Sequence, residues 1–263
     1  MSEQRTVTQL DTGVVRYEVA DRVAWLTIDR PEARNALSAE VRAGLWAGVR
    51  RFNDDDSAVL VLTGAGDKAF CAGGDLREMA DSALTVPPVD FLPQFGRNIA
   101  VDKPTIAAVN GVAYAGGFLL AMNCDLVVAA DTARFAVTEA KVGRGMPWAA
   151  PLSLLVPPRI AMQLLLTGDP IDARRAHEVG LVNEVVPLSQ LRATAQALAE
   201  RIAANAPLSV RAAKKTVGLV AELPLTEAFA AAEEAFRPVY GSADAQEGPA
   251  AFRDKRAPVW QGR

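Results

Sequence analysis

Two glycine-bearing segments have the residue types and spacing best suited to chemistry. The first covers residues 69–76 and the second residues 110–121, and each contains a pair of adjacent glycines. Each follows a short β-branched and apolar run that is typical of a buried strand. Because glycine allows a sharp turn and a close approach, backbone N–H groups there can be aimed at one oxygen atom. One such segment alone is more often a steric necessity, but the two together predict a site that binds an oxygen atom.

Other common catalytic devices are missing from the sequence. His177 is the only histidine and lies among charged residues in a helical pattern over 172–179, so no Ser-His-Asp triad is expected. The chain has no GxSxG, P-loop or HExxH motif, and no Cys, His and carboxylate cluster at metal-ligand spacing. Gly64 and Gly66 lack the third glycine of a dinucleotide fingerprint, because position 69 is alanine. We therefore expect no metal and no redox cofactor.

Composition and charge exclude several classes of protein. Of the 263 residues, 50% are apolar, and 28 basic and 31 acidic residues give a net charge of −3. Such a chain can bury a large core and has no electrostatic signal for nucleic acid or an anionic membrane. The uncharged run 104–124 is interrupted by glycine and asparagine, so it fits a strand, turn and helix better than a membrane span. The polar residues 1–10 carry no signal-peptide pattern, and we expect a cytoplasmic protein.

The two cysteines are interpreted as free thiols of a reducing compartment. Cys71 and Cys124 do not have CxxC spacing. Cys71 lies in the first glycine segment, where a nucleophilic role is conceivable. No histidine lies nearby to activate it, so a small buried thiol is the favoured interpretation.

Repeated strand, turn and helix units predict an α/β fold that positions the glycine segments. Ser38 is the expected N-cap of a helix that runs to about Phe52. Residues 85–94 include three prolines and are expected to form a loop beside the site, either a mobile lid or a plain connector. The expected strands cover 14–19 and 23–28, which form a hairpin, and 58–63, 105–109 and 125–129; helices are expected at 188–203, 208–223, 225–240 and 243–253.

The glycine segments resemble the two signatures of the enoyl-CoA hydratase/isomerase (crotonase) superfamily. Residues 30–38 resemble its early CoA-contacting segment, 164–186 its "LTG…A…GLVN.VV" stretch, and 251–258 its closing "F..KR.P". The resemblance implies the crotonase (ClpP/crotonase-like) fold, with repeated ββα units in a spiral core over 1–200 that carries an acyl-CoA site. It also implies a C-terminal helical trimerisation segment over 201–263, and a homo-oligomer that is a trimer or a dimer of trimers, a hexamer.

By this resemblance, the backbone N–H groups of Gly74 and Gly116 form the oxyanion hole for the thioester carbonyl, and Glu139 transfers protons. A thioester enolate gathers its charge on one oxygen, which two preorganised donors stabilise. Coenzyme A is then part of the substrate, and no separate cofactor is implied. Arg34 and Lys255 are expected to contact its phosphates, and Phe252 its adenine. The further expected substrate contacts are Ala36, Ala72, Asp75, Leu76, Leu119 and Trp148.

The acid/base positions depart from the hydratase pattern. Hydratases of the family place one glutamate three residues after the second oxyanion glycine and another twenty residues further on; these positions hold Leu119 and Glu139. One carboxylate can move a double bond by taking a proton from one carbon and returning it to another. An apolar Leu119 would exclude water and raise the pKa of the carboxyl group. The reaction is therefore expected to be of the Δ3,Δ2-enoyl-CoA isomerase or enoyl-CoA hydratase type, leaning toward the isomerase, in fatty acid metabolism such as β-oxidation.

A second departure and several alternatives accompany this interpretation. Residues 143–148 replace the family's "GxxPGxGG" loop, and the bulky Met146 and Trp148 are expected to select the acyl chain. The chemistry could instead be another crotonase reaction, such as that of a hydratase-lyase, a decarboxylase or a hydrolase. The loss of the first glutamate also leaves open a non-catalytic acyl-CoA-binding protein. Considered alone, Glu139, Arg34 and Lys255 could be solvated surface charges.

Overall fold

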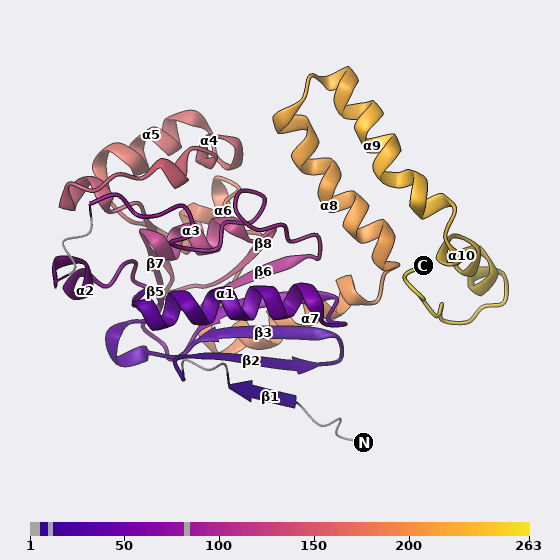
Figure 1. The fold of residues 1–263 in the computed structure, drawn as a ribbon, viewed down its shortest axis with the longest axis horizontal. Helices are drawn as coiled ribbons and strands as arrows, with labels where there is room; N and C mark the ends of the chain where they lie inside the picture. Colours follow the sequence, from indigo (N-terminus) through magenta and orange to yellow (C-terminus); the bar gives the residue numbers. More distant parts are fainter. Residues whose placement is uncertain (1–5, 10–12, 82–84) are drawn as a thin grey trace.

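A seven-stranded sheet forms the centre of the molecule (Figure 1). The computed structural model describes residues 6–9, 13–81 and 85–263, so most of the polar N-terminal stretch 1–10 lies outside the described residues. The first two strand pairs are antiparallel, and all pairs from β3 to β11 are parallel. In sheet order the strands are β1 (Thr6–Gln9), β2 (Val15–Ala20), β3 (Val23–Ile28), β4 (Val59–Gly64), β6 (Thr105–Val109), β8 (Leu126–Ala130) and β11 (Glu184–Val186).

Helices cover both faces of this sheet, and the strands between them are buried. Every residue of β3, β4 and β6 is buried, and alternate residues of each strand join one of two hydrophobic clusters. The first cluster includes Leu45 and Phe52 of α1 (Ala39–Asp54), and the second includes Leu191 of α7 (Leu188–Ala203). Strands buried on both faces carry near-continuous apolar runs, which is why the sequence predicted them.

Two of the local signals in the sequence are confirmed. The β2–β3 hairpin turns at Asp21 and Arg22, which both have positive φ (50° and 62°), as the tight turns that match strand twist require. Ser38 caps α1, and its hydroxyl oxygen accepts a hydrogen bond of 3.4 Å from the Val41 N–H.

A smaller four-stranded sheet lies beside the large one. Its order is β10 (Ile171–Asp172), β9 (Arg134–Ala136), β7 (Val112–Tyr114) and β5 (Ala69–Cys71), with β5, β7 and β9 parallel. Strands β5, β7 and β9 each come directly after a strand of the large sheet, and a helix follows each of them; β10 is reached from a helix. The order β4-β5-α2, β6-β7-α3 and β8-β9-η2 is the expected ββα repeat.

Short helices connect and cover these units. His177 belongs to α6, where its Nδ1 lies 2.9 Å from the carbonyl oxygen of Val182, so it has a local structural contact. The remaining short elements are η1 (Pro31–Ala33), α2 (Leu76–Asp81), α3 (Gly116–Asn123), η2 (Glu139–Val142), η3 (Pro147–Ala149), α4 (Leu152–Leu155), α5 (Pro158–Thr167) and α6 (Ala173–Glu178).

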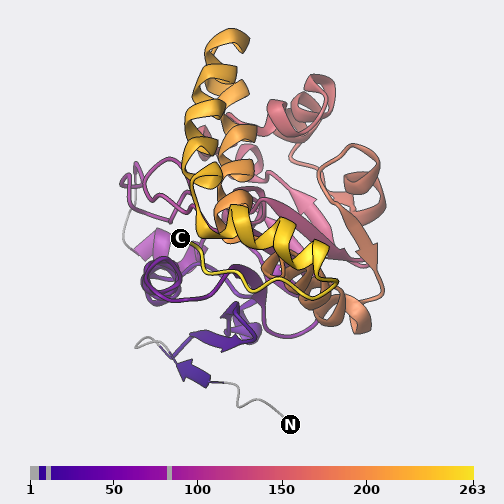
Figure 2. The same cartoon turned by 90° about the vertical axis from the view of Figure 1, so that its right-hand side faces the viewer.

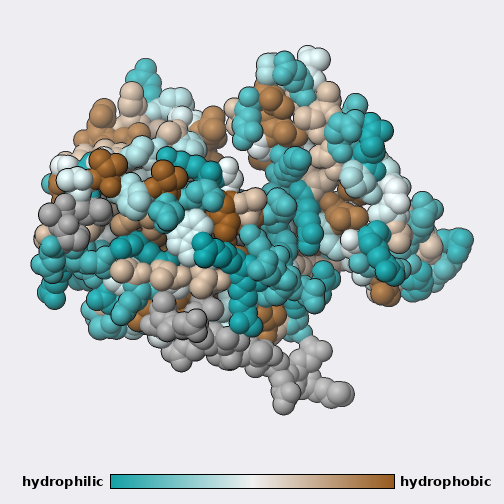
Figure 3. Space-filling view, in the orientation of Figure 1, coloured by the Kyte–Doolittle hydropathy of each residue, from teal (hydrophilic) through white to brown (hydrophobic). Residues whose placement is uncertain are grey.

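The last three helices extend away from the core. Helices α8 (Pro207–Glu222) and α9 (Leu225–Tyr240) pack side by side, and α10 (Ala243–Arg253) follows them (Figure 2). Hydrophobic side chains are exposed along the α8–α9 pair, among them Val217 and Phe229 (Figure 3). Trimerisation through 201–263 stays a prediction. Among the helices of the described residues, none is long and apolar enough to cross a bilayer.

Candidate active site

Three neighbouring strands of the small sheet lead to the three residues expected to be catalytic. Gly74 follows β5, Gly116 follows β7, and Glu139 follows β9. The middle strand, β7, pairs in parallel with both of the others. Because the carboxyl ends of neighbouring parallel strands meet at one edge of a sheet, this topology brings the two glycines and the carboxylate together.

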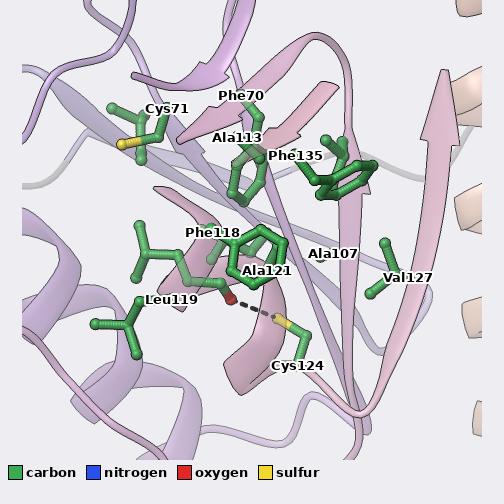
Figure 4. Close-up of a cluster of buried hydrophobic side chains, with 14 of the residues drawn as sticks. Phe70, Cys71, Ala107, Ala113, Phe118, Leu119, Ala121, Cys124, Val127 and Phe135 are labelled. Atoms are coloured by element: carbon green, nitrogen blue, oxygen red, sulfur yellow. Dashed lines mark hydrogen bonds between the residues drawn. The ribbon is translucent and has the colours of Figure 1, made fainter. Parts of the chain in front are cut away.

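The two glycine segments touch backbone to backbone, which requires glycine. A Cβ atom on Gly117 would lie 2.0 Å from the carbonyl oxygen of Cys71. Gly73 has a φ of +100°, and a Cβ atom there would lie 2.9 Å from the Cβ of Ala115. Figure 4 shows part of the buried core, in which Cys71 and Ala113 come from adjacent strands. The glycines therefore fix the spacing of the two segments.

The amides of Gly74 and Gly116 have no hydrogen-bond partner within the part of the chain that the structure describes. Gly116 is the first residue of α3, and the first N–H groups of a helix have no partner within it. The preceding residue, Ala115, has φ 51° and ψ −120°, a strained conformation for a non-glycine residue that turns the chain from β7 into α3. Within the described part of the chain, neither amide donates a hydrogen bond to a protein acceptor.

Residues 34–37 hold the first glycine segment in place. The Leu37 N–H donates to the carbonyl oxygen of Gly73 at 2.9 Å, and the Ala72 N–H donates to that of Arg34 at 3.1 Å. Both bonds leave the Gly74 N–H unused while they fix the peptide before it. The early segment and the first glycine segment therefore form one structural unit.

Glu139 is buried and has one carboxylate oxygen without a protein partner. Only 8% of the residue is exposed, so the interpretation of Glu139 as a solvated surface charge is wrong. Its Oε1 accepts a hydrogen bond of 3.0 Å from the Trp148 Nε1, whereas Oε2 is buried and has no hydrogen-bond partner. Burial raises the pKa of the carboxyl group, and the Glu139 N–H and the Trp148 bond oppose that rise. A carboxyl group with these properties is suited to general acid/base chemistry.

Apolar side chains surround the start of α3. A Cβ atom on Gly116 would lie 2.5 Å from Cδ1 of Leu37 and 3.5 Å from Cδ1 of Leu92. Leu119 is buried in the same hydrophobic cluster, and Met146 packs against that cluster. Leu92 belongs to the segment 85–94, so this loop lies beside the site as expected. Proposed substrate contacts of Leu119 and Trp148 stay predictions.

Hydrogen bonds from the core hold the 85–94 segment. The Trp46 Nε1 donates to the carbonyl oxygen of Asp90 at 2.8 Å, and the Asn123 Nδ2 donates to that of Pro93 at 2.8 Å. Asn123 ends α3, the helix that Gly116 begins. The loop is therefore tied to the helix that Gly116 begins.

The proposed CoA contacts fall into two separate groups. Arg34, Ala36, Ala72, Asp75 and Leu76 all lie in or beside the first glycine segment. Asp75 makes an ion pair of 2.8 Å with Arg30, whose guanidinium lowers the pKa of that carboxyl group. Contacts of these five residues with CoA stay predictions.

The C-terminal pair of proposed contacts is not brought to the site within one chain. Phe252 lies in α10 and is 87% exposed, and Lys255 follows that helix. Figures 1 and 2 place α10 on the far side of the α8–α9 pair from α2 and α3. Contacts of Phe252 and Lys255 with CoA stay predictions.

Two buried asparagines position the site and were not recognised from the sequence. The Asn35 Nδ2 donates to the carbonyl oxygens of Ala65 (3.0 Å) and Ala69 (2.7 Å). The Asn110 Nδ2 donates to those of Gly66 (2.9 Å) and Ala69 (3.1 Å). Together they hold the connection between β4 and β5, which leads to Gly74. Their positions in the recognised motifs could have indicated this role, because a buried side-chain amide needs hydrogen-bond partners.

An ion pair that the sequence analysis also missed anchors α2. Glu78 accepts hydrogen bonds from the Arg42 guanidinium and from the Ala39 N–H, both at 2.7 Å. The Arg42 guanidinium also donates to the carbonyl oxygen of Leu37 at 2.8 Å and lies 4.3 Å from the centre of the Phe91 ring. Arg42 therefore joins α1, α2 and the 85–94 segment around the first glycine segment.

The Cys71 thiol is buried, as the sequence indicated. Cys71 is fully buried, and burial raises the pKa of its thiol to about 12, which agrees with an inert structural thiol. Among the residues with described positions, no three His, Cys, Asp or Glu side chains are grouped closely enough to hold a metal ion.

Known proteins resemble this chain over nearly its whole length. The sequence model of the enoyl-CoA hydratase/isomerase family matches residues 18–263. An (E)-benzylidenesuccinyl-CoA hydratase of Thauera aromatica is 39% identical over 261 residues, which cover 94% of this chain and 99% of the relative. A carnitinyl-CoA dehydratase of Salmonella typhi is 39% identical over 249 residues, covering 90% of this chain and 94% of the relative.

Solved structures of similar proteins have the same fold. The enoyl-CoA hydratase from Mycobacterium tuberculosis H37Rv superimposes with a TM-score of 0.85 at 38% identity, over 95% of this chain and 99% of that one. An enoyl-CoA hydratase/isomerase from Mycobacterium paratuberculosis gives a TM-score of 0.87 at 33% identity, over 95% and 99%. These matches confirm the expected crotonase fold, and the chain belongs to the enoyl-CoA hydratase/isomerase family.

Proposed function

We propose that the protein binds an acyl-CoA thioester, holds its carbonyl oxygen with the amides of Gly74 and Gly116, and moves a proton with Glu139. Membership of the family supports an acyl-CoA enzyme. The observation that carries the catalytic assignment is the buried, unpartnered Oε2 of Glu139 at the end of β9, next to the strand that leads to Gly116.

The chemistry follows from where negative charge develops. When Oε2 takes a proton from a carbon of the acyl chain, the C–H electron pair moves toward the thioester carbonyl and leaves charge on its oxygen. Two N–H donors stabilise this enolate oxygen, and one such donor typically contributes about 2.7 to 4 kcal/mol. Return of the proton from Oε2 to a carbon of the acyl chain uses up the enolate charge, regenerates the charged carboxylate and completes the transfer.

The apolar residue at position 119 supports double-bond migration. Leu119 is buried and has no polar group that could hold or activate water. A single carboxylate can remove a proton from C2 of a 3-enoyl-CoA and return it to C4, which gives the 2-enoyl-CoA. The isomerase reaction is therefore the first candidate, and a place in fatty acid metabolism such as β-oxidation stays a prediction.

Hydration or dehydration is the second candidate, because two of the relatives are named as a hydratase and a dehydratase. Both reactions share the enolate and the proton on Glu139. They differ in whether water adds to the substrate. Conversion of 3-enoyl-CoA without uptake of water supports the first candidate, and conversion of 2-enoyl-CoA to a hydroxyacyl-CoA supports the second.

Glu139→Gln tests the shared step. We expect turnover to fall roughly 10²- to 10⁴-fold with acyl-CoA binding largely kept, because the amide cannot carry the proton. Turnover is measured with 3-enoyl-CoA and with 2-enoyl-CoA, and binding by calorimetry. Glu184→Gln, which changes an exposed carboxylate of β11, is the matched control and should retain the wild-type rate.

Two results would reject this proposal. A Glu139→Gln variant with the wild-type rate would show that another group moves the proton. Equally negligible rates in both proteins, together with tight acyl-CoA binding, would identify a non-catalytic binding protein.

A further inference from the structure

The two oxygens of the Glu139 carboxylate have different surroundings. Oε1 accepts the Trp148 N–H at 3.0 Å, and Oε2 is buried without a protein partner. An indole N–H can donate a hydrogen bond but cannot accept one. Oε1 therefore keeps a donor beside it whether or not the carboxyl group is protonated, and a proton is accommodated on Oε2.

Aromatic packing holds the Trp148 indole in this orientation. Its ring centre lies 6.2 Å from that of Phe118, and the Phe118 ring in turn lies 6.1 Å from Phe135 in an edge-to-face arrangement. Phe118 and Phe135 are 1% exposed, so they form a fixed support. Phe118 follows the glycine pair in α3 and Phe135 lies in β9, so the support connects the oxyanion helix with the strand that leads to Glu139.

The local backbone also favours a fixed indole. Trp148 is the central residue of the short helix η3, which begins at Pro147. The ring of Pro147 fixes its own φ, and the Ala149 N–H donates to the carbonyl oxygen of Met146 at 3.0 Å. The tryptophan is thus held from the backbone side and from the ring side.

We propose that Trp148 is a positioning residue that fixes the Glu139 carboxylate through Oε1, so that Oε2 alone exchanges the proton with the substrate. This inference rests on the proposed function, in which Glu139 carries the proton. It gives Trp148 a role beyond selecting the acyl chain. Position 119 is leucine, so no second carboxylate can orient Glu139, and the Trp148 N–H orients it instead.

The pH dependence separates this role from simple packing. The Trp148 N–H stabilises the charged carboxylate and so lowers the pKa of Glu139 against the effect of burial. Without this donor the pKa rises, and the base form is reached only at higher pH. The acid limb of the kcat/KM profile, which reports the free enzyme, should then move to higher pH.

Trp148→Phe removes the N–H and keeps an aromatic ring against Phe118. We expect kcat at pH 7 to fall about tenfold, KM to stay within about threefold, and the acid limb of kcat/KM to move to higher pH. Trp148→Leu also lacks a donor and should move the limb in the same direction, which covers the case in which the phenylalanine variant does not fold. Thermal unfolding of each variant establishes that the measured protein is folded.

Trp25→Phe is the matched control. It removes another indole N–H, which donates to Oε1 of Gln196 at 2.7 Å in the second hydrophobic cluster. We expect a wild-type pH profile from this variant. The double variant of Glu139→Gln with Trp148→Phe should be no slower than Glu139→Gln alone, because Trp148 acts through Glu139.

The results distinguish failure of this inference from failure of the proposed function. If Glu139→Gln is slow but the acid limb of Trp148→Phe coincides with that of the wild type, Trp148 only packs in the site and the inference is wrong. A rise in KM with an unchanged profile would assign Trp148 to the acyl-binding wall and also overturn it. If Glu139→Gln keeps the wild-type rate, the proposed function itself is wrong.

Discussion

The two sheets of this molecule are held together in different ways. The large sheet is stabilised by side chains, since β3, β4 and β6 are buried at every residue between α1 and α7. The small sheet has strands of two or three residues, and its neighbouring segments meet through backbone atoms at glycines. We infer that the large sheet supplies stability and that the small sheet supplies the exact placement of donors and a proton carrier.

The strongest test of this comparison is Gly117→Ala in the segment that follows the small sheet. The new Cβ would lie 2.0 Å from the Cys71 carbonyl oxygen, a backbone atom that cannot rotate away. We expect kcat/KM to fall at least about 100-fold, because α3 and its amide must shift, and unfolding free energy to fall by about 3 kcal/mol. Steady-state kinetics and urea unfolding measure the two effects.

Gly218→Ala is the control for this substitution. It also replaces a helical glycine, in α8, but nothing lies within 4 Å of the new Cβ. It should stabilise the protein by roughly 0.5 to 1 kcal/mol and leave activity unchanged. Wild-type activity in Gly117→Ala would break the proposed contrast between the sheets.

The contrast between the sheets also explains how much the sequence could predict. Apolar runs revealed β3, β4 and β6 because strands of five or six residues are long enough to carry a pattern. Strands of three residues, such as β5 and β7, carry no such pattern, and the sequence marks them only through the glycines beside them. The site was therefore located through backbone requirements and family resemblance, before the small sheet itself was recognised.

The contacts that fix the site were beyond sequence reasoning for a different reason. The bond from Trp148 to Glu139 depends on how η3 folds over α3, and composition contains no signal for that arrangement. Asn35 and Asn110 lie far apart in the sequence, yet both donate to the carbonyl oxygen of Ala69. Such pairings arise from tertiary packing, whereas helix caps and tight turns are local.

Lys103→Met tests the role of the large sheet. Lys103 lies at the amino end of β6, an inner strand of that sheet, away from the site. Lys103 precedes β6 and is 5% exposed; its Nζ donates to the Asp55 carbonyl oxygen at 2.7 Å and lies 3.6 Å from Oδ1. Tyr17 donates to the other oxygen of that carboxylate at 2.6 Å. Removing the lysine leaves these acceptors short of a donor, so unfolding free energy should fall by about 1 to 3 kcal/mol.

The activity of the same variant decides whether the sheets act separately. We expect kcat and KM of Lys103→Met to stay within about twofold of the wild type, because no site residue contacts the altered network. Lys215→Met, at an exposed position of α8, should change neither stability nor activity. A large loss of activity in the folded Lys103→Met protein would show that the large sheet sets the geometry of the site directly.

The smallest expected effect is the decrease in unfolding free energy that results from burying the charged Glu139 carboxylate after β9 of the small sheet. Burial raises the pKa of the Glu139 carboxyl group above its ordinary value, so the folded state binds this proton more tightly than the unfolded state does. By linkage, the unfolding free energy of the wild type decreases as pH rises from the pKa of Glu139 in the unfolded state through its pKa in the folded state.

Glu139→Gln removes this pH-dependent decrease in unfolding free energy. The difference in unfolding free energy, variant minus wild type, should therefore be greater at pH 8 than at pH 4. Urea unfolding at both pH values measures this double difference, which cancels the pH-independent effect of the amide, and Glu184→Gln should show no such change. A difference that is the same at both pH values would mean that the charged carboxylate is as well accommodated in the folded site as in water, and that the small sheet holds its chemistry without loss of stability.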